Sequence, residues 1–345
     1  MEIQEILDIK WQNILLVGMR WLQNFWDELI LLGNIKLLQK QNKNIFIVSQ
    51  NIPRLKKFLE WEVDCSNITF IGELPRWFRS FFRYLKNCNF RQLKLFFKID
   101  TIILWWGEIL TEETKTAYYY RLCSLWPSLF FKKKLYIMWW IQVPQKRINR
   151  FLFNWILRHT EHIYCRDFEW IENLKEYGFS KVSFFMDTSY FAREKRWTYK
   201  QEKKEKYIVI NINKNWIKFI DDLKSTLIDY QKNWYNCYYI PVSNGWNDTQ
   251  DENILKKRMI PIHLKNTEND LKYLPELKKD FPQIEVYDWT QNLENFFHFL
   301  WGAEIVISPR LHLYLISSFI WTKTKVYPYQ KKILKMQEVL KKLKV

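Results

Sequence analysis

Short apolar runs alternate along the first half of the chain with longer segments in which apolar residues recur every three or four positions. The short runs predict strands at 13–18, 44–49, 68–71, 100–104, 134–139, 161–165 and 181–186. The longer segments predict helices at 26–40, 53–60, 76–87, 114–125, 147–158 and 167–177. Strands that alternate with helices favour a parallel sheet with crossover helices, as in α/β proteins.

The same alternation resumes after a charged and polar segment at 191–206, which we interpret as a linker. Further strands are expected at 207–211, 236–242, 283–287, 304–308 and 324–327, and helices at 215–232, 266–278, 291–300, 310–319 and 330–343. A length of 345 residues suits two domains. The prediction is an α/β protein with two Rossmann-like, doubly wound domains, 1–190 and 207–345, facing a cleft. Ligands of such folds bind beyond the carboxyl ends of the strands.

The last predicted helix is basic and amphipathic. Its expected apolar side consists of Ile333, Leu334, Met336, Val339, Leu340 and Leu343. Packing of this side against the C-terminal domain explains the pattern without further assumption. Docking on an anionic membrane surface is the alternative.

The net charge of +17 comes mostly from Lys, and the chain is also rich in Asn, Ile, Tyr and Phe. AT-rich codons encode these residues, so mutational bias accounts for part of the charge. The remainder favours an anionic substrate or an anionic membrane face. Nucleic acid is disfavoured as a partner, because the sequence has no zinc-finger spacing, no RNP-like aromatic motif and no basic helix with heptads.

The five Cys are scattered and form no C-x-x-C pair, which favours a reducing compartment and argues against a metal site or a disulfide framework. The first residues resemble no signal peptide, and no apolar run reaches the length of a membrane span. We therefore expect a cytoplasmic protein, at most peripheral to the inner membrane face, with no metal.

The chain has 19 Trp and only 7 Gly, whereas about 24 Gly would be ordinary for its length. Several Trp follow predicted strands, where small residues usually let a ligand approach the backbone. Examples are Trp21, Trp26, Trp105, Trp106 and Trp139. The hypothesis is that a UGA codon, read as glycine in some bacterial lineages, has been translated as tryptophan. These residues should then lie in tight turns whose backbone suits glycine. A genuinely Trp-rich carbohydrate binder is the alternative.

Two segments in the first half place polar residues near predicted strand ends. Asn24, Asp27 and Glu28 open the first long helix, where acidic residues stabilise the helix terminus or face sugar hydroxyls. Trp105, Trp106 and Gly107 follow a buried strand. With glycine restored, they would form a turn whose N–H groups could cradle a phosphate or carboxylate.

Two further segments carry basic residues at strand ends. Arg166 follows a predicted strand and could reach an anion, or it could pair with a carboxylate; Asp167 beside it could simply cap the next helix. Ser308, Arg310 and His312 lie at the turn from another strand into a helix. A helix amino terminus and an Arg fork both favour anions, and a His beside them suits acid–base chemistry.

In order and spacing these four segments resemble the polysaccharide pyruvyl transferase family. Its members typically show G-N-x-G-D-E near the amino terminus, G-G-G after an inner strand, an R-D-x-x-S-like segment, and S-x-R-x-H late in the chain. Here the corresponding segments read QNFWDE at 23–28, WWG at 105–107, RDFE at 166–169 and SPRLH at 308–312. The departures are largely Gly to Trp, as the recoding hypothesis predicts.

The resemblance implies a GT-B-like fold and transfer of pyruvate from phosphoenolpyruvate to a hexose of a cell-wall or other cell-surface polysaccharide, or of its lipid-linked precursor. It implies no cofactor. His312 would be the general acid and Arg310 a catalytic cation. The phosphoenolpyruvate donor would be held by Arg166, Arg310, Ser308 and Gly107, and the acceptor sugar by Asn24, Asp27 and Glu28. A GT-B-type glycosyltransferase that uses a nucleotide sugar and a non-catalytic carbohydrate-binding protein stay open as alternatives.

Overall fold

The computed structural model describes the chain in eleven segments. They are residues 7–18, 25–49, 52–72, 90–110, 132–141, 143–192, 206–213, 215–242, 270–289, 292–328 and 331–343. Within them the chain divides into two compact units. The first comprises residues 1–21 and 29–192, and the second comprises 22–28 and 193–345. The second unit therefore includes a short segment from near the amino terminus.

The first unit is built on a seven-stranded parallel sheet of order β3-β2-β1-β4-β5-β6-β7. Its strands are β1 (Asn13–Val17), β2 (Asn44–Val48), β3 (Ile68–Ile71), β4 (Thr101–Leu110), β5 (Lys134–Ile141), β6 (Thr160–Cys165) and β7 (Val182–Phe184). The strand order reverses between β1 and β4, which pair in parallel. That reversal is the point at which doubly wound sheets bind ligands.

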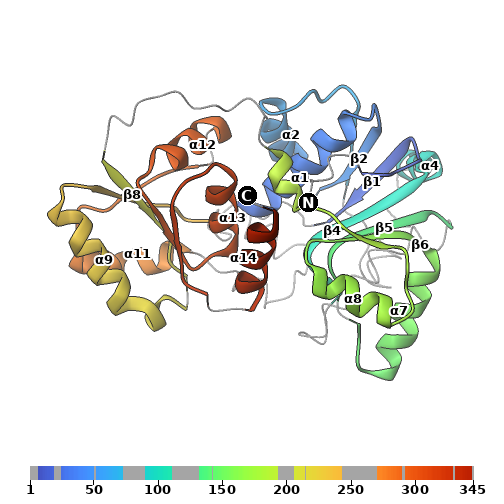
Figure 1. Cartoon of the computed structure of the whole chain (residues 1–345). Coiled ribbons are helices and arrows are strands. Elements are labelled where there is room, and N and C mark those ends of the chain that lie inside the picture. Colours follow the sequence, from blue (N-terminus) through green and yellow to red (C-terminus); the bar gives the residue numbers. More distant parts are fainter. Residues whose placement is uncertain are drawn as a thin grey trace. The chain divides into compact units, whose positions relative to one another are not determined.

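Helices cover both faces of this sheet. They are α1 (Phe25–Gln39), α2 (Ile52–Glu60), α4 (Phe90–Lys98), α7 (Arg147–His159) and α8 (Phe168–Glu176), and a 3₁₀ helix follows at Thr188–Ala192. In Figure 1, α1 and α2 lie above the sheet and α7 and α8 below it. Right-handed crossovers produce this split when the chain winds outward in both directions from a central strand.

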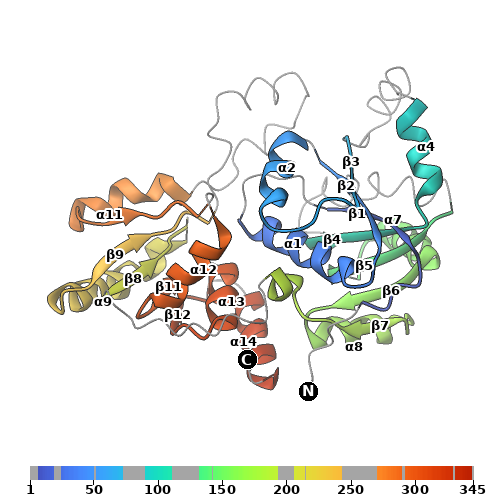
Figure 2. The same cartoon turned by 90° about the horizontal axis from the view of Figure 1, so that it is seen from above.

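The second unit holds a five-stranded parallel sheet of order β10-β9-β8-β11-β12. Its strands are β8 (Tyr207–Ile210), β9 (Asn236–Tyr239), β10 (Glu285–Val286), β11 (Val306–Ser308) and β12 (Thr324–Val326). Its helices are α9 (Ile220–Lys232), α11 (Leu274–Asp280), α12 (Leu293–Gly302), α13 (Leu311–Phe319) and α14 (Lys331–Leu343), with 3₁₀ helices at Trp216–Phe219 and Asp270–Tyr273. Figure 2 shows α12, α13 and α14 beside β11 and β12, and α9 and α11 beside β8 and β9.

Each sheet has its own apolar core. Buried Ile, Leu, Val and Phe side chains of the first sheet pack against α4, α7 and α8. In the second unit the strand residues Ile208, Ile210 and Ile307 pack with Leu223 and Leu227 of α9. Two separate cores, each under a parallel sheet, confirm the predicted class of two doubly wound α/β domains.

Every predicted strand is present, although several begin or end a few residues away from the expected positions. The predicted helices at 76–87 and 114–125 lie outside the described residues. Two strands were predicted too short. β4 continues through the Trp105–Trp106 pair to Leu110, and β5 continues past Trp139 to Ile141.

The basic helix α14 buries most of its apolar side. Ile333, Met336, Val339, Leu340 and Leu343 are buried, whereas Leu334, which was expected on the same side, is 48% exposed. Packing within the chain therefore accounts for the amphipathic pattern. Among the described helices, none is both long and apolar enough to cross a bilayer.

Candidate functional site

The strand order of the second sheet reverses between β8 and β11, which pair side by side. Polar residues gather at the carboxyl ends of both strands. Asn211 and Asn213 follow β8, and Ser308 ends β11, and all three are buried. The Ser308 hydroxyl lies 3.3 Å from the Asn211 side-chain oxygen and accepts a 2.9 Å hydrogen bond from the Arg310 backbone N–H. The sequence predicted Ser308 and Arg310 at this position, and they do lie together.

A buried ion pair joins Arg310 to Asp270, the first residue of a 3₁₀ helix. Nε of Arg310 donates to the Asp270 carboxylate at 3.1 Å, and Nη2 donates to its second oxygen, so the pair is bidentate. The Asp270 side chain is fully buried, and that of Arg310 is 12% exposed. Two of the three guanidinium nitrogens therefore contact a carboxylate of the protein itself. This bidentate contact fixes the plane of the Arg310 guanidinium group.

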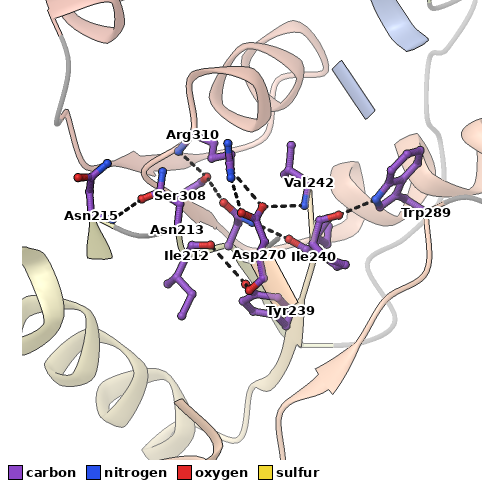
Figure 3. A network of polar contacts seen from close by, with 12 residues as sticks. Ile212, Asn213, Asn215, Tyr239, Ile240, Val242, Asp270, Trp289, Ser308 and Arg310 are labelled. Atoms are coloured by element: carbon purple, nitrogen blue, oxygen red, sulfur yellow. Dashed lines mark hydrogen bonds and ion pairs between the residues drawn. The ribbon is translucent and has the colours of Figure 1, made fainter. Parts of the chain in front are cut away.

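Asp270 is held by further hydrogen bonds (Figure 3). The Asn211 amide donates to its carboxylate at 3.0 Å and the Val242 N–H at 3.1 Å, while the Tyr239 hydroxyl donates to its carbonyl oxygen at 2.7 Å. Burial, and then the Asp270 charge, raise the pKa of Tyr239 well above its usual value. The side-chain amide nitrogen of Asn213 is also buried, and it has no hydrogen-bond partner among the described residues. The cluster thus presents a fixed cation beside a buried N–H donor.

His312 lies two residues beyond Arg310 in the first turn of α13. Its imidazole stacks on the indole of Trp26, with the ring centroids 4.3 Å apart and the ring planes 4° from parallel. Trp26 belongs to the amino-terminal segment that forms part of the second unit. Two segments 286 residues apart in sequence are thereby in contact, and both were singled out by motif.

The start of α1 carries two buried carboxylates. Asp27 is 6% exposed and Glu28 is 3% exposed. One carboxylate oxygen of Asp27 has no hydrogen-bond partner among the described residues, and burial raises the pKa of this group to about 8. A carboxyl with such a pKa exchanges protons near neutral pH. Asn24, the third residue predicted for this site, lies outside the described residues.

Arg166 lies directly after β6 in the first unit, and it is buried. Its Nη1 donates to Asp187 at 2.7 Å, while the Asp187 carboxylate also accepts from the Ser189 N–H and hydroxyl. Burial raises the pKa of Asp187, and the Arg166 charge opposes that shift. The neighbouring Asp167 is the N-cap residue of the next helix. It caps α8 by accepting from the Trp170 N–H at 3.0 Å, as the sequence suggested.

The predicted glycine turn at 105–107 is wrong, because all three residues lie within β4. Gly107 coincides with an irregularity in the β4–β5 pairing, where the register skips from Trp106 to Glu108. At the end of β1, a Cβ on Gly18 would come within 2.3 Å of the Trp105 carbonyl oxygen. Close approach of the two strands at the reversal point therefore requires a glycine at residue 18.

The glycine-type backbone expected at five Trp positions is present at one of them. Trp139 has a φ of +94°. Trp26 is helical, and Trp105 and Trp106 are in a strand, so the prediction of tight turns is wrong for them. Trp139 has the expected backbone, but the predicted tight turn is wrong for it too, because it lies inside β5. Trp21 lies outside the described residues.

Three residues of the two polar clusters carried no recognisable sequence signal. Asp270 and Asp187 pair with the predicted arginines, and Asn211 connects Asp270 to Ser308. Asn211 is the last residue of the predicted strand at 207–211 and directly follows the observed β8, so its place at the strand end is the one available clue. The cluster around Arg166 belongs to the first unit, and the cluster around Arg310 belongs to the second.

Comparison with known proteins identifies the family. The family model for polysaccharide pyruvyl transferase matches residues 24–318. The chain belongs to the polysaccharide pyruvyl transferase family. It is therefore a transferase that acts in polysaccharide metabolism. No curated protein matches it in sequence.

Solved structures resemble this member of the family in fold. UDP-GlcNAc 2-epimerase from Methanocaldococcus jannaschii matches with a TM-score of 0.54 at 11% identity, covering 96% of this chain and 92% of that one. The Neisseria meningitidis enzyme of the same name, bound to UDP-GlcNAc, gives 0.51 at 11% identity, with coverage of 97% and 91%. A glycosyltransferase from Rickettsia africae gives 0.50 at 11% identity, with coverage of 92% and 79%. At these identities the likeness supports the GT-B-like fold alone.

Proposed function

We propose that this family member transfers pyruvate from phosphoenolpyruvate to one hexose of a cell-surface polysaccharide or of its lipid-linked precursor, forming a pyruvate ketal. The proposal places the reaction in the cytoplasm, at or near the inner membrane face, where such precursors are assembled. Family membership supports the reaction class. The observation that carries the residue assignment is the stacking of His312 on Trp26, which brings the motif around Asp27 and the motif around Arg310 into one unit.

The reaction needs a proton donor and a proton acceptor. A proton added to the methylene carbon of phosphoenolpyruvate makes the neighbouring carbon electrophilic, and one sugar hydroxyl adds there. A second hydroxyl of the same hexose then displaces phosphate from that carbon, which closes the ketal and releases inorganic phosphate. Each hydroxyl gives up a proton, one of which replaces the proton consumed at the methylene carbon.

His312 is our candidate for the donor of the first proton, because an imidazole titrates near neutral pH and can act as a general acid. Asp27 is our candidate for contact with the acceptor. Its buried carboxyl, with a pKa of about 8, suits exchange of a proton with a sugar hydroxyl. Glu28 and Asn24 complete the proposed acceptor contacts.

The donor carries a carboxylate and a phosphate, so it requires cations and N–H donors. Arg310 is the proposed catalytic cation, and its fork is oriented by Asp270. Ser308 and the buried Asn213 amide flank it at the strand ends, where doubly wound sheets bind ligands. Arg166 of the first unit is a further proposed anion contact, and Asp187 orients its guanidinium group.

The direct test is release of inorganic phosphate from phosphoenolpyruvate in the presence of a panel of lipid-linked sugars. Two proteins are compared, the chain itself and the same chain with Trp139→Gly, the position inside β5 with a φ of +94°. We expect release that depends on a sugar and a product whose mass corresponds to a pyruvate ketal. Release without any sugar dependence, or no release by either protein across the panel, would contradict the proposal.

A further inference from the structure

Four helices of the described chain end in the same hydrogen-bond pattern. Beyond α8, the Gly178 N–H donates to the Lys175 carbonyl at 2.9 Å and the Phe179 N–H donates to the Leu174 carbonyl at 2.9 Å. Gly178 has a φ of +96°. This is the Schellman motif, in which the residue after the C-cap adopts a left-handed conformation. Glycine is the usual residue there, since it lacks the Cβ that makes the conformation costly.

Helix α1 ends in the same way with the second most favoured residue. The Asn42 N–H donates to the Gln39 carbonyl at 2.9 Å, and the Lys43 N–H donates to the Leu38 carbonyl at 3.2 Å. Asn42 has a φ of +54°. Asparagine visits this conformation more readily than most residues do. These two helices therefore follow the ordinary chemistry of helix ends.

Helices α9 and α13 end in the same motif with tryptophan at the left-handed position. At α9, Trp234 (φ +61°) donates to the Gln231 carbonyl at 2.9 Å, and the next N–H donates to the Tyr230 carbonyl at 3.2 Å. At α13, Trp321 (φ +64°) donates to the Ser318 carbonyl at 3.1 Å, and the next N–H donates to the Ser317 carbonyl at 2.9 Å. The backbone at both positions has the conformation that glycine adopts at Gly178.

Neither indole compensates for this backbone by packing. Trp234 is 89% exposed and Trp321 is 73% exposed. An exposed indole removes little apolar surface from water, so it contributes little stabilisation. The Cβ of the same residue makes the left-handed conformation unfavourable. By contrast Trp61, which follows α2 and is 82% exposed, is not among the residues with a positive φ. All three tryptophans are therefore exposed, but only Trp234 and Trp321 have the positive φ that favours glycine.

A third tryptophan has the least favourable backbone. Trp139 lies within β5 with a φ of +94°, close to the +96° of Gly178. A bulky residue at such a φ is a true outlier. The Trp139 indole is buried, and its N–H has no hydrogen-bond partner among the described residues. The ring also lies under the Arg166 guanidinium, whose central carbon is 5.4 Å from the ring centroid.

Five non-glycine residues of the described chain have a positive φ, and three of them are tryptophan. We propose that the natural polypeptide carries glycine at positions 139, 234 and 321, because the gene has UGA codons there that its own cell decodes as glycine. The inference rests on backbone geometry and does not depend on the proposed reaction. It also predicts that the natural protein leaves the face of Arg166 next to residue 139 uncovered.

The first test determines residue identity and requires no refolding. The codons at 139, 234 and 321 are read from the gene, and the tryptic peptides that contain these positions are weighed from protein isolated from its native cells. The proposal expects UGA codons and peptide masses that correspond to glycine. UGG codons, or masses that correspond to tryptophan, would overturn it.

The second test measures the backbone cost in recombinant protein. Trp234→Gly and Trp321→Gly should each raise the folding equilibrium constant by about fivefold, because removal of a left-handed Cβ outweighs the extra flexibility of glycine in the unfolded chain. The matched control is Trp61→Gly, which removes an equally exposed indole at a helix end without a positive φ. This control should lower the constant, since only the entropic cost of glycine remains.

Alanine variants separate the effect of the left-handed backbone on stability from the effect of the indole side chain. Trp234→Ala and Trp321→Ala remove the indole but keep the Cβ, so they should recover little of the gain. Urea unfolding gives the constants for all five variants. Equal changes for Trp234→Gly, Trp321→Gly and Trp61→Gly would show that the two helix ends do not require glycine, and this result would overturn the proposal.

Discussion

His312 has one face of its imidazole against the Trp26 indole and lies two residues from Arg310, in the first turn of α13. We predict that His312→Gln lowers turnover by about 10²–10⁴-fold, since a general acid acts mainly in the transition state. Glutamine keeps a hydrogen-bonding side chain, so binding of phosphoenolpyruvate should change little. The measurements are phosphate release and a donor titration. The matched control, His298→Gln in α12, removes a part-exposed histidine and should leave both values unchanged. Full activity of His312→Gln would exclude this residue as the acid.

Asp27 should make stability depend on pH in an unusual direction. Its folded-state pKa of about 8 lies above the unfolded value of about 4, so the folded state holds the extra proton between these pH values. Stability therefore falls as the pH rises from 4 to 8. Asp27→Asn removes this pH-dependent contribution. From pH 5 to pH 8 the parent should therefore lose up to about 4 kcal/mol of unfolding free energy relative to the variant.

Urea unfolding across this range measures the effect of Asp27→Asn. Asp64→Asn is the control, since its carboxyl is exposed and hydrogen bonds to Ser66 hold its pKa below the usual range. Its contribution to stability is complete above pH 4 and should not change between pH 5 and 8. A constant difference between Asp27→Asn and the parent over this range would show that Asp27 is ionised in the folded protein.

Sequence reasoning found the arginines of the two clusters but not their partners. Arg310 was predicted from its place between a strand and a helix, yet Asp270 lies 40 residues earlier, within the predicted helix at 266–278, where no motif distinguishes it. Arg166 was expected to reach an anion or pair with a carboxylate. It pairs with Asp187, 21 residues later, while the adjacent Asp167 caps α8. Such pairs follow from the folding of distant strand ends to one edge of a sheet, which local patterns do not encode.

At the scale of elements, periodicity predicted where strands and helices occur better than where they end. β4 was expected to stop before its Trp pair and β5 within its Trp pair, at Trp139, because Trp-rich segments looked like turns. The parallel pairing of the two strands carries both through these residues, with irregular register beyond Trp106. Tertiary pairing thus overrode local turn chemistry. Helix starts with a clear cap were predicted well, as the first residue of α8 shows.

The cap of α8 gives a prediction about stability. Asp167 accepts a hydrogen bond from the Trp170 N–H and satisfies one of the unpaired donors of the first turn. Asp167→Ala should cost about 1 kcal/mol of unfolding free energy. Asp167→Asn is the matched variant, because its side-chain oxygen still accepts from the backbone, and it should lose much less. Urea unfolding of both variants checks this, and equal losses would mean that the negative charge matters more than the cap.

At the scale of the whole molecule, both sheets reverse their strand order at one point, β1 beside β4 and β8 beside β11. Three of the four family-like segments follow a strand or open a helix, whereas residues 105–107 lie within β4. In the second sheet, Ser308 ends a strand at the reversal itself. The strand alternation in the sequence could therefore predict the fold class and the edge of each sheet where the polar clusters lie. The arrangement of one unit against the other depends on contacts that no local pattern specifies.

The nature of the donor can be decided on the whole protein by ligand-induced stabilisation. A ligand that binds only the folded state at 100 times its Kd stabilises it by about 2.7 kcal/mol. We predict that phosphoenolpyruvate raises the Tm of the protein carrying Trp139→Gly, whereas UDP and UDP-sugars do not. Inorganic phosphate at the same concentration and ionic strength is the control, since a net charge of +17 attracts any anion. A rise with UDP-sugars alone would instead favour a glycosyltransferase with a nucleotide-sugar donor.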